Sequence, residues 1–84
     1  MKKEDLFLKE NQKLKRLQLM VDLTVQILYQ SKNLDLETGM WYIKNAKKFT
    51  NILFPGKEEV FDLIYKPRFL RVLKERGVIK FSEN

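Results

Sequence analysis

The sequence predicts an all-α fold, a small helical bundle that forms a single domain over residues 1–84. Apolar residues recur at helical spacing from about residue 3 to residue 32 without an internal proline or glycine. Pro55-Gly56 and Pro67 then divide the second half of the chain into shorter helical segments. Hydrophobic residues make up 44% and charged residues 33%, a balance typical of folded domains rather than disordered tails.

The first predicted helix spans about residues 3–32, and its two halves differ in polarity. Its apolar positions at helical spacing are Phe7, Leu14, Leu17, Val21, Val25 and Leu28. A basic stripe in the first half continues in the second half as an apolar one, and its residues in order are Lys2, Lys9, Lys13, Arg16, Met20, Leu23 and Ile27. The second half is therefore apolar almost all round, so we expect later helices or another chain to cover it on two sides.

The second predicted helix spans residues 36–53 and packs antiparallel on the first. Asn33 is suited to a left-handed helix end, and Asp35 is placed to cap the helix that follows. One side of this second helix is rich in small residues, and we expect it to face the first helix. This side contains Gly39, Ile43, Ala46, Thr50 and Leu53. Gly39 on that side predicts a close approach between helices.

Two short helices are expected to close the bundle. Pro55-Gly56 ends the second helix, and a third begins at Lys57 with Val60, Phe61 and Ile64 on its buried face. Pro67 favours the start of a fourth helix, although a single kinked helix is the competing interpretation. Phe69, Val72 and Leu73 point inward from this last segment. Gly77 occupies the position of a left-handed cap, and Val78 is placed to contact Leu73.

Composition excludes several kinds of chemistry. The chain contains no cysteine, so it has neither a disulfide framework nor a thiolate zinc site. It contains no histidine, so Ser/His and Cys/His catalysis and HExxH zinc chemistry are excluded. No apolar run approaches the ~20 residues that a membrane span needs, and no secretory signal is visible. We therefore expect a cytoplasmic protein that is not an enzyme and uses no cofactor.

The length of the first helix predicts self-association. A helix of about 28 residues is ~42 Å long, whereas a compact chain of this size has a diameter of only ~30 Å. The first helix therefore extends beyond its own domain. Its apolar residues expected to be poorly covered in a monomer are Leu6, Phe7, Leu14 and Leu17. Pairing with a second copy is the simplest way to bury them, and fraying of residues 1–10 is the alternative.

Basic residues indicate a second possible partner, nucleic acid. The chain has a net charge of +6, and its last helical segment is rich in cations. The candidate phosphate or partner contacts are Lys66, Arg68, Arg71 and Lys74, extended by Trp41, Lys44 and Lys48. A solvated helix face is the alternative for the cations of the last segment, and core packing is the alternative for Tyr42 and Phe49, which interleave with lysines. Trp41 lies toward the lysine side, where an exposed tryptophan would mark a partner contact.

Glu58 and Asp62 lie four residues apart and so share one helix face. Two carboxylates make a poor Mg²⁺ or Ca²⁺ site, and an Asp62 to Lys66 ion pair explains Asp62 better. Arg76 falls on the inward side of the last helix, where it either extends to solvent or meets a carboxylate across an interface. We assign no metal site to these residues.

Residues 53–58, LFPGKE, together with DLIY at 62–65 and PRF at 67–69, resemble a stretch in short uncharacterised bacterial proteins. The resemblance covers about a quarter of the chain and implies no activity, cofactor or site residue. The function that the sequence favours is a non-enzymatic interaction protein that self-associates through its first helix. A small basic nucleic-acid-binding protein is the alternative.

Overall fold

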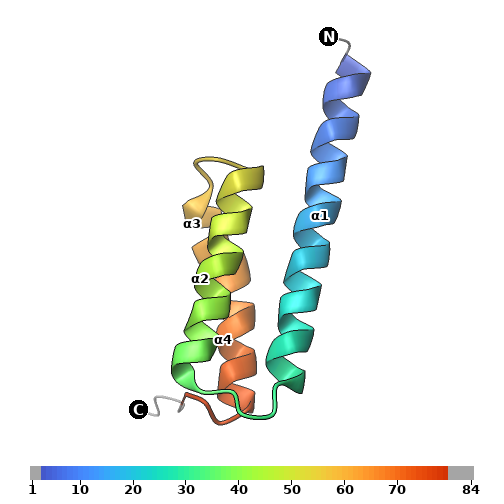
Figure 1. Ribbon diagram of the computed structural model, residues 1–84. Helices are drawn as coiled ribbons and strands as arrows, with labels where there is room; N and C mark the ends of the chain where they lie inside the picture. Colours follow the sequence, from blue (N-terminus) through green and yellow to red (C-terminus); the bar gives the residue numbers. More distant parts are fainter. Residues whose placement is uncertain (1–2, 80–84) are drawn as a thin grey trace.

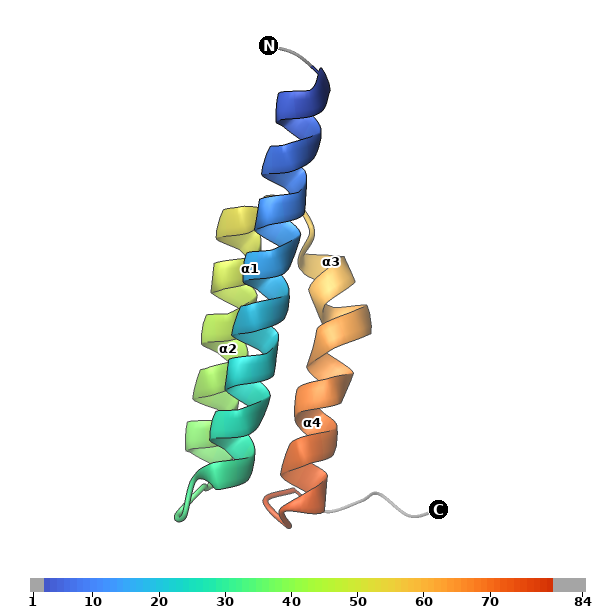
Figure 2. The ribbon, with the colours of Figure 1, turned by 90° about the vertical axis from the view of Figure 1, so that its right-hand side faces the viewer.

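The computed structural model describes residues 3–79, and side chains from Lys9 onward. Three helical segments form an all-α bundle: α1 (Lys3–Gln30), α2 (Leu36–Leu53), and a continuous C-terminal stretch made of α3 (Glu58–Val60), the π-helical turn η1 (Phe61–Tyr65) and α4 (Lys66–Glu75). Helix α2 runs antiparallel to both of the others (Figure 1). All three segments contact one another, and α1 lies in front of α2 and beside α4 in the view turned by 90° (Figure 2). The predicted fold class is thereby confirmed.

Helix α2 has the predicted bounds because both of its ends carry local signals. The Asp35 side chain accepts a hydrogen bond of 2.8 Å from the Thr38 backbone N–H, as expected of an N-cap. After Phe54 the chain turns at Gly56, whose φ of 81° lies in the left-handed region. Asn33 does not adopt that region, contrary to our expectation, because no non-glycine residue with positive φ occurs within residues 3–79. Instead, the Ser31 hydroxyl and backbone N–H both donate to the Ile27 carbonyl at the end of α1.

The two short helices expected at the C-terminus are one continuous helical stretch, so the competing interpretation of a single helix is correct. Lys66, the residue before Pro67, keeps helical dihedrals of −56° and −43°. Proline lacks the N–H that would bond to the carbonyl four residues earlier, and its ring crowds that carbonyl. The wider π-helical turn directly before Pro67 accommodates this loss, which is a typical use of such turns.

The π-helical turn also changes which residues face the core. Phe61 is fully buried, but Val60 and Ile64, which the sequence placed on the same buried face, are exposed. A turn of i→i+5 type shifts the helical phase, so Tyr65 packs against the core where Ile64 was expected. The prediction for Val60 and Ile64 was therefore wrong because it assumed regular α-helical spacing.

The core lies between the three segments, and each segment contributes to it. Its buried members are Leu17, Val21 and Leu28 from α1, Ile43 and Ala46 from α2, and Phe61, Phe69, Val72 and Leu73 from the C-terminal stretch. A Cβ atom on Gly39 would lie 2.8 Å from Cδ2 of Leu73. Gly39 therefore permits a close approach to α4, and the expectation that it faces the first helix was wrong.

The C-terminal stretch ends as the sequence predicts. Gly77 has a φ of 74°, and its N–H donates to the Lys74 carbonyl. The Val78 N–H donates to the Leu73 carbonyl over 2.8 Å, which completes the hydrogen-bond pattern of a left-handed helix cap. This cap directs Val78 and Ile79 back against the core.

Candidate interaction surfaces

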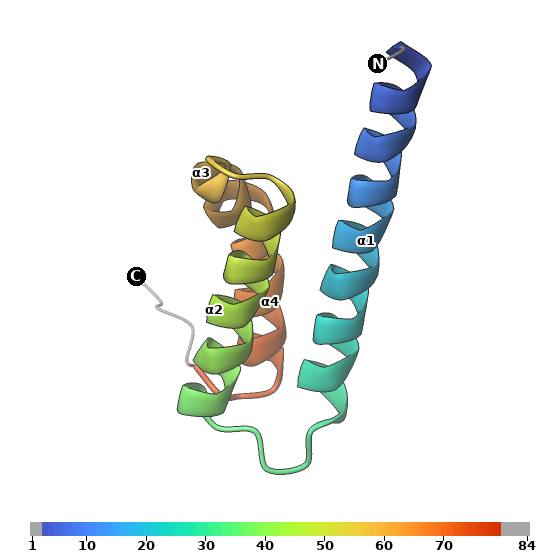
Figure 3. The ribbon, with the colours of Figure 1, turned by 45° about the horizontal axis from the view of Figure 1, so that its top comes forward.

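Helix α1 extends beyond the rest of the bundle at its N-terminal end (Figures 1 and 3). Lys9, Glu10, Asn11 and Gln12 are all exposed, so no side of α1 is covered there. The structure confirms the predicted overhang for this part of the helix. The side chains of Leu6 and Phe7, two of the four residues assigned to self-association, lie outside the described part of the chain.

Leu14 and Leu17, the other two residues of that set, differ in burial. Leu14 is 46% exposed, as expected of a residue near the overhang. Leu17 is only 4% exposed, and the expectation that it is poorly covered was wrong. The reason is that α2 already reaches this turn of α1, where Leu17 and Thr50 line the same hollow. The cover of α1 therefore decreases over the turn that contains Leu14 and ends before Gln12.

A groove of about 240 Å³, which we call the Leu14 groove, begins at this point. Its apolar lining comes from Leu14 and Leu17 of α1, Phe54 after α2, and Val60 and Tyr65 of the C-terminal stretch. The turn at Gly56 places Phe54 and Val60 on the same side of α1. Lys57 stands at its margin, and the ammonium of Lys13 lies 5.9 Å from the centre of the Phe54 ring. The groove is thus apolar inside and basic at its edge.

A second apolar surface lies on the α2 side of α1 and extends around that helix away from the Leu14 groove. Leu19 is 59% and Leu23 48% exposed, and Ile27 and Phe49 are also exposed. Arg16, Met20 and Phe49 line a shallow hollow of about 290 Å³ with the two leucines. We call the surface formed by Leu19, Met20, Leu23, Ile27 and Phe49 the α1–α2 face. The later helices bury Leu17, Val21 and Leu28 on the core side of α1, whereas Leu19, Leu23 and Ile27 stay exposed beside Phe49 in the part of the chain that the structure describes.

The predicted cationic contacts divide between two sides of α4. Arg68 and Arg71 line a hollow of about 150 Å³ beside Tyr29, and the Arg68 guanidinium lies 4.0 Å from the Asp22 carboxylate. Lys74 lines a neighbouring hollow with Pro67 and Arg71. Lys66 instead faces α2, because it is two residues before Arg68 and so lies about 200° away around the helix.

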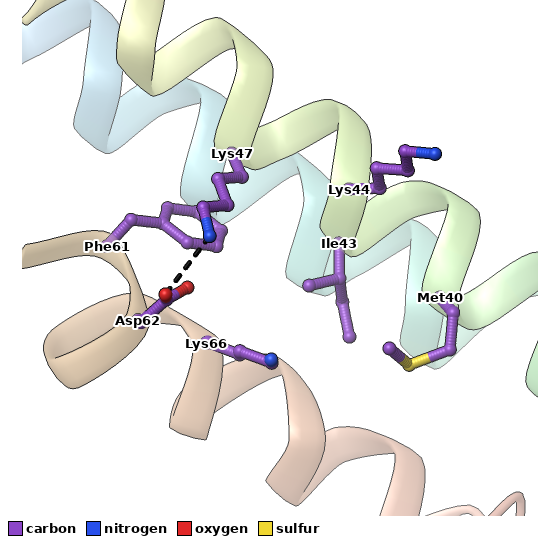
Figure 4. Close-up of a pocket in the computed structure, with 7 residues that line it drawn as sticks. All are labelled: Met40, Ile43, Lys44, Lys47, Phe61, Asp62 and Lys66. Carbon is purple, nitrogen blue, oxygen red and sulfur yellow. Dashed lines mark hydrogen bonds and ion pairs between the residues drawn. The ribbon is translucent and has the colours of Figure 1, made fainter. Parts of the chain in front are cut away.

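Lys66 joins a different cluster, which contains Lys44, Lys47 and Asp62 above the apolar side chains of Met40, Ile43 and Phe61 (Figure 4). The Lys47 ammonium donates to the Asp62 carboxylate over 3.0 Å, and Lys44 points away from it. The predicted Asp62 to Lys66 pair is therefore replaced by a pair that joins α2 to the π-helical turn. The sequence prediction missed it because Lys47 and Asp62 are brought together only by the turn at Gly56.

Trp41 is 58% exposed, as expected, and its ring meets that of Tyr42 edge to face with 5.1 Å between centres. Lys44 and Lys48 are exposed on the same helix. Trp41 and Lys48 are seven residues apart and therefore lie one above the other on the outer side of α2. Trp41 and Lys48 therefore form a mixed aromatic and basic strip on α2, whereas Lys44 belongs to the cluster around Asp62.

Two polar contacts near the C-terminal end of α1 could not be predicted from sequence spacing. The Arg76 guanidinium donates to the carbonyls of Leu28 and Tyr29 over 2.6 Å and 3.2 Å. It therefore satisfies the last turn of α1, rather than reaching solvent or a carboxylate as expected. The Tyr29 hydroxyl donates to the Glu75 carboxylate, which raises the pKa of Tyr29 above its ordinary value. The signal for the Arg76 contact in the sequence is the place of this cation among apolar residues on the inward side of the last helix.

No group of three acidic side chains gathers in a way that would hold a metal ion in the part of the chain that the structure describes. Among helices α1 to α4, none is both long and apolar enough to cross a bilayer. Comparison with known proteins yields no matching family model, curated protein or solved structure.

Proposed function

We propose that this chain is a non-enzymatic interaction protein that self-associates through the N-terminal part of α1. The observation that carries this proposal is the exposed Leu14, with its groove, at the point where α1 leaves the bundle. A second copy offers the same side of α1, on which Phe7 and Leu14 are the apolar positions of this part of the helix. The absence of histidine and cysteine from the sequence supports a role other than histidine-dependent or thiol catalysis.

The sequence repeat of α1 supports the same surface. Phe7, Leu14, Val21 and Leu28 are seven residues apart, so these positions share one side of the helix. Val21 and Leu28 are fully buried by the chain's own helices, and Leu14 is only half covered. Position 7 continues this side into the overhang. A second copy that packs there would extend the buried side of α1 by two turns.

The mixed charge near this surface is compatible with pairing of identical chains. Glu10 lies 3.9 Å from the Lys13 ammonium on the overhang, and Lys57 stands at the margin of the groove. A second copy therefore brings carboxylates as well as ammonium groups to the contact. Such a surface can match itself, as an interface with two-fold symmetry requires.

A matched pair of substitutions tests this function. We expect Leu14→Glu to weaken self-association at least tenfold, because it places a carboxylate in the apolar groove. Leu63 is 77% exposed on the C-terminal stretch, so Leu63→Glu serves as the control. Sedimentation equilibrium at several concentrations measures the self-association constant of each variant, and circular dichroism verifies that each variant stays helical.

Two outcomes contradict the proposal. One is a monomeric wild type at every concentration, and the other is a Leu14→Glu variant that associates as strongly as Leu63→Glu.

Nucleic-acid binding is the second candidate, supported by the exposed Arg68 and Arg71 on one side of α4. Counterion release predicts that binding to a mixed-sequence duplex weakens steeply between about 50 and 200 mM salt. Arg71→Gln should weaken binding to the duplex without changing the oligomeric state of the protein. No binding at the lower salt concentration rejects this candidate. The likeness of residues 53–69 to short bacterial proteins stays a prediction beside both functions.

A further inference from the structure

The α1–α2 face lies on the other side of α1 from the Leu14 groove. Leu14 and Leu23 are nine residues apart, which corresponds to two and a half helical turns and so to opposite sides of the helix. Leu19, Leu23 and Ile27 repeat every four residues along this face, and each is exposed. Phe49 adds an aromatic ring from α2 to the hollow beside them. The face is therefore a surface separate from the one used in the proposed function.

The charge along this side of α1 is polarised. Reading from the N-terminal end, the stripe consists of Lys9, Lys13, Arg16, Met20, Leu23 and Ile27. Its first half carries three cations and its second half three apolar side chains. Lys13 pairs with Glu10 over 3.9 Å and its ammonium lies against the Phe54 ring, so Lys9 and Arg16 are the cations of the stripe that take part in no ion pair within residues 9–79. The nearby Asp22 is directed to Arg68 on another side of the helix.

From this arrangement we infer that the α1–α2 face binds an amphipathic helix of another protein that has an acidic half and an apolar half. Its apolar half would cover Leu19, Leu23 and Phe49, and its carboxylates would lie along Lys9 and Arg16. Exposed apolar residues at helical spacing beside a shallow hollow are typical of surfaces that receive a helix. The basic half then selects the partner by charge and sets its direction.

A second copy of this chain does not fit the same face. In a parallel pair the three cations of one stripe would lie against those of the other. In an antiparallel pair they would lie against Met20, Leu23 and Ile27, where no carboxylate compensates for their loss of water. Both arrangements leave charges unmatched, whereas a helix with an acidic half matches the stripe along its whole length.

Synthetic helical peptides of about 21 residues provide the probe, since helices much shorter than this are marginal in water. The test peptides place leucines at helical spacing in one half and glutamates at the same positions in the other, with the acidic half at either end. The control peptides replace each glutamate by lysine. The chain contains one tryptophan, Trp41, which is exposed on α2, and its fluorescence is followed during the titration. Isothermal titration gives the stoichiometry.

We expect one of the two acidic peptides to bind with a stoichiometry of one peptide to one chain, at least tenfold more tightly than its lysine counterpart. Its affinity should fall as the salt concentration rises, because salt screens the charge contact. Leu23→Glu and Arg16→Glu should each weaken this binding at least tenfold. Leu14→Glu should leave it unchanged, so failure of self-association and failure of this inference are distinguishable.

Three results overturn the inference. The first is that neither acidic peptide binds at about 100 μM, and the second is that the lysine peptides bind equally well. The third is that Leu23→Glu abolishes self-association, which would identify a second copy as the occupant. Vesicles with and without phosphatidylglycerol are tested in parallel, and tight binding to the anionic vesicles without peptide binding would identify a lipid surface instead.

Discussion

At the scale of single residues, Arg76 has the contact with the clearest energetic consequence. The last carbonyls of a helix have no partner within it, and those of α1 are turned toward α4. One guanidinium nitrogen of Arg76 bonds to two of them, which joins the ends of α1 and α4. Hydrogen bonds from a charged donor to neutral acceptors are among the stronger ones in proteins.

We expect Arg76→Met to lower the free energy of unfolding by about 1–3 kcal/mol, since the aliphatic stem is kept and the bonds to Leu28 and Tyr29 are lost. Urea unfolding followed by circular dichroism measures the effect. Arg71→Met is the matched control, because Arg71 is exposed on the same helix. Equal losses in both variants would show that the helix end does not depend on Arg76.

Asp35 gives a prediction about pH. The hydrogen bond from the Thr38 backbone N–H holds the pKa of Asp35 below its ordinary value. A pKa lowered by folding contributes stability above the unfolded value of about 4, and this stability is lost as the pH falls through the folded pKa. Wild type should therefore lose more stability than Asp35→Asn on acidification, because the asparagine cap does not titrate.

The urea midpoints of both proteins at pH about 6 and about 2.5 measure this difference. The two midpoints should fall by different amounts, with the larger fall in the wild type. Equal falls would mean that the Asp35 cap contributes no pH dependence.

At the scale of the helical segments, Gly39 decides how closely α2 and α4 approach. We expect Gly39→Val to destabilise the protein by about 1–3 kcal/mol, because overpacking against Leu73 exceeds the gain in helix propensity. Lys44→Val, at an exposed position of the same helix, is the control in urea unfolding. In the Gly39→Val background Leu73→Ala should cost less than in the wild type. Additive costs would show that the two positions are not in contact.

Local signals explain why some elements could be predicted from the sequence. The bounds of α2 follow from a capping aspartate and a Pro-Gly turn, and the end of α4 follows from Gly77. The π-helical turn could not be predicted in this way. As a statistical rule, the residue before a proline avoids helical dihedrals. Here Phe61 precedes Pro67 in the sequence and Phe69 follows it, and the packing of both rings in the core keeps the segment helical.

The candidate surfaces were predicted only in part for a similar reason. The change from cations to apolar residues along α1 is visible in the sequence, so the need for a second cover was predictable. Which side stays open depends on where α4 lies, and that is a non-local property. Burial of Leu17 likewise depends on where α2 packs along α1, and the contact of Lys47 with Asp62 depends on the turn at Gly56, whose geometry brings distant segments together.

At the scale of the whole molecule, the chain is unusually extended for its size. Its radius of gyration is 15.0 Å and its extents are 51 × 28 × 16 Å, whereas a compact domain of this length has a radius near 12 Å. The overhang of α1 accounts for the long axis (Figure 3). An extended monomer buries less apolar surface than a compact one, so association through α1 would add to its stability.

The central claim is that this overhang pairs with a second copy, and the mass of the wild-type protein in solution tests it most directly. Light scattering on the full chain at tens of micromolar should give about twice the monomer mass of 10.2 kDa and fall toward that mass on dilution. A mass of 10.2 kDa at every concentration would contradict the account.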